Sequence, residues 1–420
     1  MKKLVCLVFV TSILFSCEKN NSEGEHDSIP TVTTTEVSAL TGSGANSGGN
    51  ISADGGSEVT ARGVCWSTTS NPTTVDNHTT DGAGKGTFIS NITGLSQYTK
   101  YYLRSYATNV KGTAYGNEIS FTTAGPSVYV AGGDSVKAFL WINGTKTPLT
   151  DGSFTSLAKS VVVSGNDVYV GGFHNGYPRI WKNGVATTLP VNNYGEVTSL
   201  FVAGTDVYAG GSDDFISGGK PKVWKNSVAL NTETGQYGGW VNSVFVSGSD
   251  VYAGGAHFRT QYIYTPAFWK NGVLTRLSDT QGSVNAIWVS GPDVYAVGFE
   301  YLGGGIVARV WKNGVGTSLA TNNSGANSIF ISGNDIYIGG YESDGIKAIP
   351  KIWKNGVPTI LSNNDKGASV ASVYVSENDI YATGTESNGS NDVLVMWKNG
   401  VSTPLTNGTF NARSFSIFVK

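Results

Sequence analysis

The stretch that decides the fold runs from Ser328 to Leu361. It opens with Ser-Ile-Phe-Ile-Ser-Gly-Asn-Asp-Ile-Tyr-Ile-Gly-Gly and ends with Lys-Ile-Trp-Lys-Asn-Gly-Val-Pro-Thr-Ile-Leu. Alternating apolar residues on both sides of Ser-Gly-Asn-Asp predict two short strands, A and B. A third strand, C, ends at the tryptophan. Asn-Gly joins it to a fourth, D, because both residues of such a turn need positive φ. One copy therefore predicts a four-stranded antiparallel sheet.

The pattern is a repeat with a nearly fixed period. Successive tryptophans lie 40, 43, 45, 42, 42 and 44 residues apart. They are Trp141, Trp181, Trp224, Trp269, Trp311, Trp353 and Trp397. Four short strands in each period predict an all-β fold in which residues 125–420 form a seven-bladed β-propeller. The period is too short for tandem sandwiches, and a solenoid is a weaker alternative. We expect the tryptophans to pack between blades.

The two ends of the array predict how the ring closes. The first copy begins at Ser127 directly with strand B, and the chain ends at Ser416–Lys420 with a strand A that nothing follows. We expect residues 415–420 to supply the missing strand of the first blade, because pairing removes two open strand edges.

The end of strand B carries a second family signal. Diglycines follow an aromatic residue in most copies, and Gly298 and Gly384 keep only the second glycine. This pattern resembles kelch repeats over strand B and more loosely over strand C. The resemblance implies a kelch-like propeller.

The first residues resemble a bacterial lipoprotein signal. Lys2 and Lys3 precede an apolar run from Leu4 to Phe15, and Cys17 follows Ser16. The resemblance implies a signal peptide over 1–16 and lipidation of Cys17, which would anchor the protein in the outer membrane. An ordinary secretory signal is the alternative. Polar residues 17–29 predict a flexible tether. The acidic residues after Cys17 resemble the export signal of surface-displayed bacterial lipoproteins, which implies display at the cell surface, with a periplasm-facing position also open.

Residues 30–124 lack the repeat and predict a β-sandwich of short strands. The segment around Tyr101, together with Ala61–Ser67, resembles a fibronectin type III domain. That resemblance implies a tyrosine corner at Tyr101 and a core position for Trp66. We expect this domain to act as a spacer.

Charge and motifs exclude several functions. Without residues 1–16 the chain holds 26 basic and 30 acidic side chains, a net charge near −4, which argues against a nucleic-acid partner. Cys65 would be the only thiol left, in an apolar run that predicts an inert buried group. The sequence contains no HExxH, GxSxG, CxxC or phosphate-loop motif, so we expect no metal and no cofactor. We expect a monomer.

Candidate site residues lie where the copies differ. The B–C and D–A connections vary in length and emerge on one face, here called the loop face, whereas the A–B and C–D turns are nearly invariant. Two residues after each second glycine the chain carries a mostly ionisable set, which fold symmetry arranges as a ring: Ser135, His174, Asp213, His257, Glu300, Glu342 and Glu386. The candidate ligand-binding set comprises the six ionisable members and four loop aromatics, Tyr177, Trp240, Tyr262 and Tyr301.

Three functions fit this pattern. Acids beside aromatic rings suit a glycan, so the first hypothesis is a scaffold that binds a glycan or a protein. A polysaccharide-active glycosidase or lyase is the second, since Glu300, Glu342 and Glu386 could supply a carboxylate pair. A structural envelope protein is the third, because strand ends favour polar residues in any case.

One further pattern is internal to the repeat. An aspartate opens strand B and a lysine closes strand C in six copies, as at Asp335 and Lys354. We expect the two to pair across the strands, with only about 0–1 kcal/mol from each exposed pair.

Overall fold

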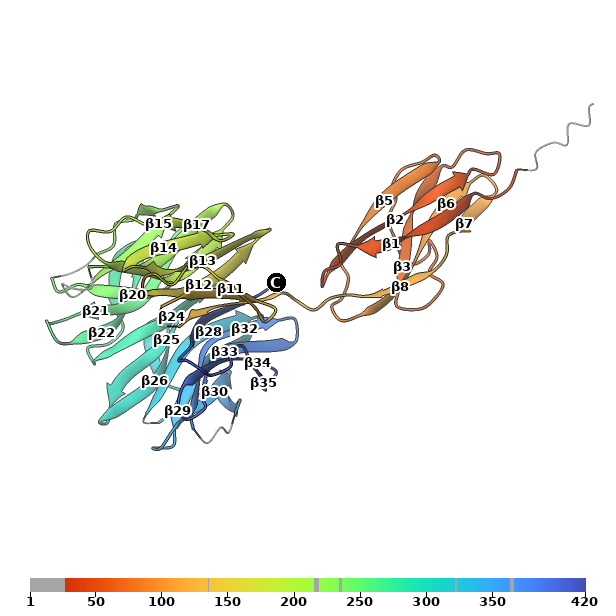
Figure 1. Cartoon of the computed structure of the whole chain (residues 1–420). Helices are drawn as coiled ribbons and strands as arrows, with labels where there is room; N and C mark the ends of the chain where they lie inside the picture. The colour runs from red at the N-terminus through yellow and green to blue at the C-terminus, as the bar shows by residue number, and fades with distance from the viewer. Residues whose placement is uncertain (1–26, 135, 215–218, 234–235, 322, 363–365) are drawn as a thin grey trace, which may run out of the picture. The chain divides into compact units, whose positions relative to one another are not determined.

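The computed structural model describes residues 27–134, 136–214, 219–233, 236–321, 323–362 and 366–420, in which every regular element is a β-strand (Figure 1). The predicted signal peptide, the lipidation site Cys17 and residues 18–26 of the tether lie outside the described residues. The chain divides into two compact units between Gly125 and Pro126. Within the described part of the chain, no helix is long and apolar enough to cross a membrane.

The first unit consists of two antiparallel sheets around one core. One sheet has the order β1 (Thr31–Ser38), β2 (Gly44–Ala53), β5 (Gly86–Thr93). The other has the order β4 (Asn77–His78), β3 (Ala61–Ser67), β6 (Lys100–Asn109), β7 (Gly112–Tyr115), and β8 (Ile119–Thr122) also pairs with β6. Trp66 is buried in the shared core, as predicted. The Tyr101 hydroxyl accepts a hydrogen bond from the Ser96 amide at 3.0 Å, so the predicted corner contact is present.

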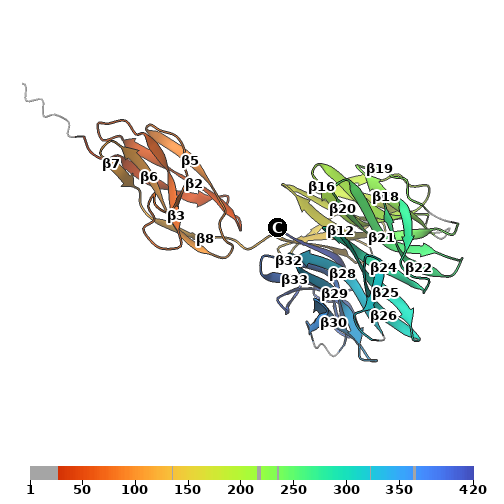
Figure 2. The same ribbon diagram turned by 180° about the vertical axis from the view of Figure 1, so that it is seen from behind.

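The second unit is a β-propeller. Its described residues form seven four-stranded antiparallel sheets (Figures 1 and 2). In each sheet the strands follow one another from strand A outward. The first sheet holds β36 (Arg413–Val419), β9 (Val128–Gly133), β10 (Ala138–Ile142) and β11 (Thr145–Pro148), and the second holds β12 (Ser156–Ser164), β13 (Asp167–His174), β14 (Tyr177–Lys182) and β15 (Val185–Thr188). The third holds β16 (Gly195–Ala203), β17 (Asp206–Asp213), β18 (Lys220–Lys225) and β19 (Val228–Ala229), and the fourth holds β20 (Gly239–Ser247), β21 (Asp250–Phe258), β22 (Tyr264–Lys270) and β23 (Val273–Arg276). The other three are β24 (Gly282–Ser290), β25 (Asp293–Leu302), β26 (Gly305–Lys312), β27 (Val315–Ser318); β28 (Ser324–Ser332), β29 (Asp335–Ser343), β30 (Ala348–Lys354), β31 (Val357–Ile360); and β32 (Ala368–Ser376), β33 (Asp379–Ser387), β34 (Asp392–Lys398), β35 (Val401–Pro404).

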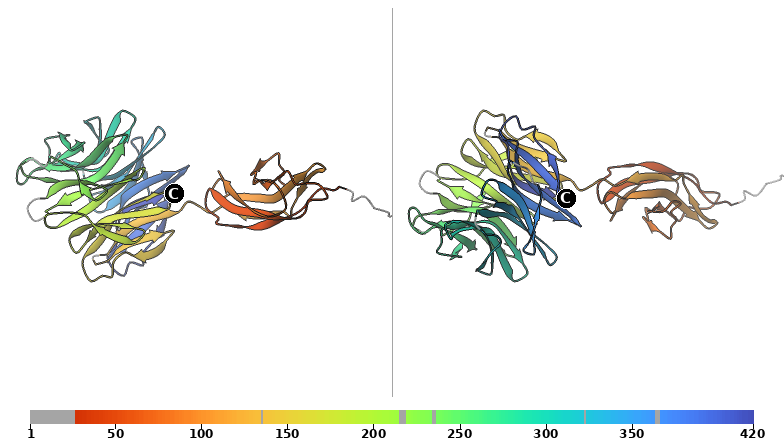
Figure 3. Two further views of the ribbon diagram at one scale, coloured as in Figure 1. Left: turned by 90° about the horizontal axis from the view of Figure 1, so that it is seen from above. Right: turned by 90° about the horizontal axis from the view of Figure 1, so that it is seen from below.

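The innermost strands form a closed cycle. They contact one another in the order β12, β16, β20, β24, β28, β32, β36 and back to β12, and Figure 3 shows the sheets around a common centre. β36 pairs antiparallel with β9, so the prediction that the chain's last residues complete the first sheet is confirmed. The strand begins two residues earlier than expected, at Arg413.

Serine hydroxyls join neighbouring sheets along this cycle. In six of the seven described seams, the serine near the middle of strand A accepts a hydrogen bond from a backbone amide of the next strand A, at 2.9–3.2 Å. The last of these bonds runs from the Val161 amide to Ser416 and closes the ring between distant parts of the chain. Ala286 occupies the position in β24 and offers no hydroxyl.

The repeated glycines are explained by a bulge in each strand A. The register slips by one residue there, for example between Val241 and Ser243. In six sheets the slip brings a carbonyl oxygen of strand A against the second glycine of strand B, and in the first sheet the Arg413 oxygen lies against Gly132, the first of its pair. A Cβ added at Gly255 would lie 2.0 Å from the Trp240 oxygen, which no side chain can accept. The second glycine is therefore required by close packing.

The first glycine is exchangeable because it faces the next sheet. A Cβ added at Gly254 would lie 2.7 Å from the Val284 side chain. Where strand B carries Val297 in place of this glycine, the facing residue is the smaller Ala326, and both belong to one buried cluster. Volume is thus conserved across the seam.

The tryptophans fill the same seams, as predicted. Each has 2% or less of its surface exposed. Trp224 packs against Ile180 and Leu189 of the preceding sheet, and its indole Nε1 donates to the Pro190 carbonyl at 3.1 Å.

The predicted aspartate–lysine pairs are confirmed in all six copies, with Nζ–Oδ2 distances of 2.7–2.8 Å. The turn asparagine adds a contact that the sequence did not predict. In the copy with Asp335, the Asn355 amide donates to the carboxylate at 2.7 Å, and its oxygen accepts from the Ile336 amide at 2.8 Å. Lys354 and then Asn355 hold the pKa of Asp335 below its usual range.

Removing residues 415–420 should lower the melting temperature strongly. β9 loses its partner strand, and the two seams that β36 forms with β12 and β32 lose one of their sides. Ser416→Ala removes only the closing hydrogen bond and should cost about 1 kcal/mol. Thermal unfolding followed by circular dichroism measures both. An unchanged melting curve for the truncated protein would contradict the closure.

Ala326→Val should overpack the seam against Val297 and destabilise the protein by about 1–3 kcal/mol. Adding Val297→Gly should recover much of that loss, because it restores the valine–glycine arrangement of other seams. Denaturant unfolding of both single variants and the double variant gives the coupling energy. Strict additivity would show that the two positions do not share volume.

The six paired aspartates predict a loss of stability in acid. A carboxyl whose folded pKa is depressed stabilises the fold above its unfolded pKa, about 3.9, and this contribution disappears as the pH falls through the lower folded value. The melting temperature should therefore fall below about pH 4. Asp335→Asn with Asp293→Asn should make that fall shallower. An equally steep fall in the double variant would rule out these pairs as its source.

Candidate functional site

The predicted ionisable ring lies at the ends of the second strands on the loop face, but three of its carboxylates pair with cations of their own sheets. Asp213 is fully buried, lies 3.7 Å from the Lys222 Nζ atom, and accepts hydrogen bonds from the backbone and side chain of Asn192 at 3.0 and 3.1 Å. The carboxylate is thus held by its own sheet and by the loop that precedes that sheet.

Glu300 and Glu342 repeat this arrangement. The Glu300 Oε2 atom lies 2.6 Å from Arg309 Nε, and the carboxylate is almost fully buried. Glu342 forms an ion pair with Lys351. In each case the cation lies two residues before the tryptophan of strand C. Each of these carboxylates is therefore neutralised by its own cation. The described residues contain no group of three or more acidic, histidine or cysteine side chains placed to hold a metal ion.

His257 and Glu386 are the unsatisfied members. His257 has 3% of its surface exposed, and neither ring nitrogen has a hydrogen-bond partner among the described residues. Burial, and then the positive charge of Arg276, lowers the pKa of His257, so the ring stays neutral at physiological pH. One carboxylate oxygen of Glu386 is likewise buried without a partner. Ser135 lies outside the described residues.

His174 and Tyr177 border an open groove between the first two sheets. The groove has a volume of about 460 Å³ and is lined by Val136, Ser153, Phe154, Thr155, Asn175, Gly176 and Tyr194. Phe154 and Tyr194 are about half exposed. His174 packs edge-on against Phe154 with ring centroids 5.8 Å apart, and its Nδ1 atom lies 2.8 Å from the Ser156 hydroxyl. Tyr177 packs against Tyr194 at 6.0 Å. The groove therefore has two aromatic walls that are supported from behind.

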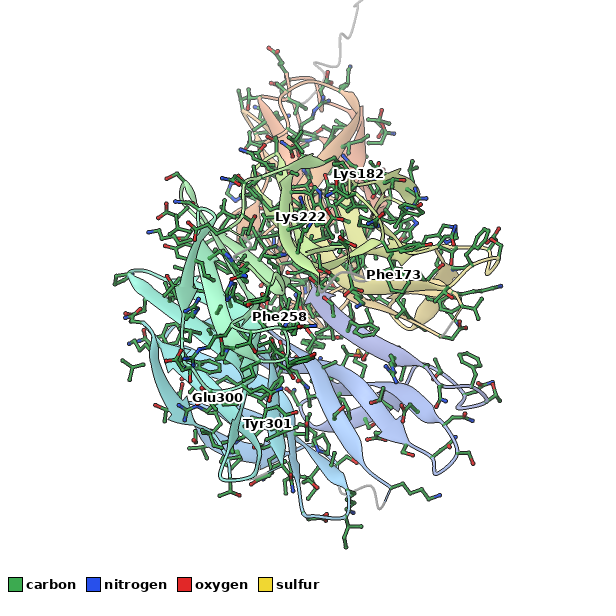
Figure 4. The ribbon with its side chains drawn as sticks, turned by 90° about the vertical axis from the view of Figure 1, so that its left-hand side faces the viewer. Phe173, Lys182, Lys222, Phe258, Glu300 and Tyr301 are labelled. Carbon is green, nitrogen blue, oxygen red and sulfur yellow. The ribbon has the colours of Figure 1, made fainter. Side chains whose placement is uncertain are left out.

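Trp240 and Tyr301 belong to a second aromatic cluster. Trp240 packs against Phe258 at 5.5 Å and Tyr264 at 5.0 Å between ring centroids. Burial, and then the nearby Tyr301, raises the pKa of Tyr264. Figure 4 shows Phe258 on β21 and the adjacent Glu300 and Tyr301 on β25. Tyr301 is 42% exposed and Tyr262 is 79% exposed, so these two rings are open to solvent.

The predicted site set includes none of the residues that line the groove, Phe154 and Asn175 among them. Asn175 and Gly176 both have positive φ and form a tight turn between β13 and β14. That Asn-Gly pair was visible in the sequence as a turn, but nothing in it indicated that Phe154 from the preceding loop would lie beside it. Cys65, by contrast, is fully buried, and burial raises the pKa of its thiol to about 11, as its apolar surroundings predicted.

The sequence matches no family model and no curated protein. Among solved structures, TolB from Acinetobacter baumannii is similar over 75% of this chain and 79% of its own, at 10% identity and a TM-score of 0.41. Dipeptidyl peptidase 4 from Porphyromonas gingivalis is similar over 65% of this chain and 49% of its own, at 11% identity and 0.37. A DUF4784 family protein from Bacteroides caccae aligns over 92% and 98%, at 12% identity and 0.29. Likenesses this distant carry no argument about function.

Proposed function

We propose that this protein is a lipid-anchored outer-membrane protein whose propeller binds a glycan on the loop face. In this proposal Cys17 carries the anchor, the first unit is a fibronectin type III-like spacer, and the second is a kelch-like, seven-bladed scaffold. The ligand site is the groove with Phe154 and Tyr194 as its walls. The protein faces the cell exterior.

The groove's combination of walls and polar groups is the observation that carries the proposal. Phe154 and Tyr194 offer exposed ring faces on which a sugar ring can stack, and packing against His174 and Tyr177 limits their motion. Ser153, Thr155 and Asn175 line the same space and can exchange hydrogen bonds with hydroxyl groups. Apolar walls with a few polar groups are typical of small-molecule sites.

Catalysis receives less support. Glycoside hydrolysis needs two carboxyl groups that flank the scissile bond. Glu300 and Glu342 are each paired with a cation on their own sheet, which favours a structural role for them. We therefore advance binding and not hydrolysis.

A glycan array probed with the full-length chain tests this function. We expect binding to a subset of glycans, and Phe154→Ala or Tyr194→Ala should weaken it about tenfold, since the loss of one stacking wall costs about 1–1.5 kcal/mol. Tyr237→Ala is the matched control, because it removes a similarly exposed ring on the loop face outside the groove.

Three results would contradict the proposal. A silent array with a protein captured from cell envelopes would favour a protein ligand. Release of sugar products from an arrayed glycan would favour an enzyme. Equal binding by the groove variants and the wild-type protein would remove the groove from the site.

A further inference from the structure

The bulges in the innermost strands direct seven side chains toward the propeller axis. The register slip in each strand A leaves one unpaired residue, and these are Lys159, Thr198, Asn242, Asn285, Asn327, Ala371 and Phe415. All seven line the axial channel at its loop-face end, which has a volume of about 480 Å³. That volume falls within the range of small-molecule sites, about 300–1,000 Å³.

Consecutive polar residues of this set form an arc in which each amide nitrogen donates to the next sheet. Asn242 Nδ2 donates to the Val284 carbonyl at 2.8 Å, Asn285 Nδ2 to the Ala326 carbonyl at 2.9 Å, and Asn327 Nδ2 to the Val370 carbonyl at 2.7 Å. An amide whose nitrogen is fixed on a carbonyl must direct its oxygen elsewhere. The oxygens of Asn242 and Asn285 accept no hydrogen bond from any described residue. The arc therefore presents free acceptors to the channel.

The opposite side of the same mouth mixes apolar bulge residues with the polar Ser369, Thr385 and Ser414 and the charged Asp392 and Arg413. Ala371 and Phe415 complete the ring of bulge residues, and Phe415 is only partly buried. The Lys159 ammonium pairs with Glu196 and lies 5.8 Å from the Phe415 ring centroid. Because Ala371 and Phe415 occupy the position in two sheets, the fold itself does not require an amide there. The three amides each bridge to a carbonyl of the next strand A, and two of them also carry a side-chain oxygen that this bridge does not use.

Farther along the channel the lining becomes aromatic. Phe201, Phe245, Trp288, Phe330, Tyr374 and Phe418 follow one another around the axis, with neighbouring ring centroids 4.5–5.0 Å apart. A polar ligand is favoured at the loop-face end because the aromatic end offers few hydrogen-bonding partners. The polar end of the channel opens on the loop face, which also carries the proposed groove.

We propose that the mouth of the channel is a second site, which takes a single pyranose-type sugar ring. Hydroxyl groups of the sugar donate to the oxygens of Asn242 and Asn285, and its apolar face packs on Phe415. A metal cation fits less well, because Lys159 and Arg413 balance the charges of Glu196 and Asp392 and leave no excess negative charge. The inference rests on the proposed function only for the class of ligand, since the residues are separate from the groove.

Titration calorimetry of the full-length chain with free glucose, galactose, mannose, N-acetylglucosamine and glucuronic acid tests this site. At least one sugar should bind. Asn242→Ala with Asn285→Ala should weaken that binding about tenfold or more, and Phe415→Leu should weaken it while keeping an apolar side chain. Tyr237→Ala is the matched control and should leave the titration unchanged, because Tyr237 lines neither the groove nor the channel mouth. Melting curves of each variant show whether it is folded.

The outcomes separate this inference from the proposed function. Array binding that depends on Phe154, with no heat from any free sugar, would overturn the channel site and leave the groove standing. A silent array with a sugar titration that depends on Asn242 and Asn285 would do the reverse. If a folded Asn242→Ala, Asn285→Ala protein binds the sugar as tightly as the wild-type chain, the channel site is wrong. If the amide variant does not fold, Phe415→Leu alone decides, and unchanged affinity in that variant overturns the site.

Discussion

The bulge in each innermost strand is the local irregularity on which the propeller depends. By slipping the register one residue, it brings a strand-A carbonyl onto a glycine of strand B and excludes any side chain there. It also leaves the following serine placed to accept an amide of the next sheet. The unpaired residue faces the axis. A single backbone feature thus fixes a glycine, joins two sheets and lines the channel.

Packing across the seams explains where the repeat tolerates change. The first glycine of the pair can be replaced provided the facing residue shrinks, as Val297 and Ala326 illustrate. Read alone, the missing diglycine at Val297 weakens the likeness to kelch repeats. Together with the smaller facing residue Ala326, however, Val297 keeps the total side-chain volume of the seam unchanged. This matters because adding or removing even one methylene group in a densely packed interior affects stability. The repeat therefore varies at this position for reasons of packing.

The candidate site was only partly predictable. Fold symmetry placed residues such as Glu300 at corresponding strand ends, but it gave no information about the cations two residues before three of the tryptophans, which pair with Asp213, Glu300 and Glu342. His174 and Tyr177 do lie beside an open groove, whereas Phe154 enters it from a separate loop. Loop conformation depends on contacts among several connections, which a strand pattern does not encode. The amide arc was missed because the bulge residues differ in type from copy to copy, and only the strand register shows that they share one position at the axis.

The sequence by itself determined the four-stranded unit, its sevenfold repetition and the pairing of the C-terminal strand with the first sheet. Period, turn chemistry and unpaired strand edges are local or countable properties, so they can be read along the chain. It also determined the aspartate–lysine pairs, because both residues recur at fixed positions on adjacent strands. Only the tertiary structure decided which polar groups are free. Whether a side chain such as Asn242 or Asp213 can meet a ligand depends on which neighbours have already satisfied it, and those neighbours come from sheets that are distant in sequence.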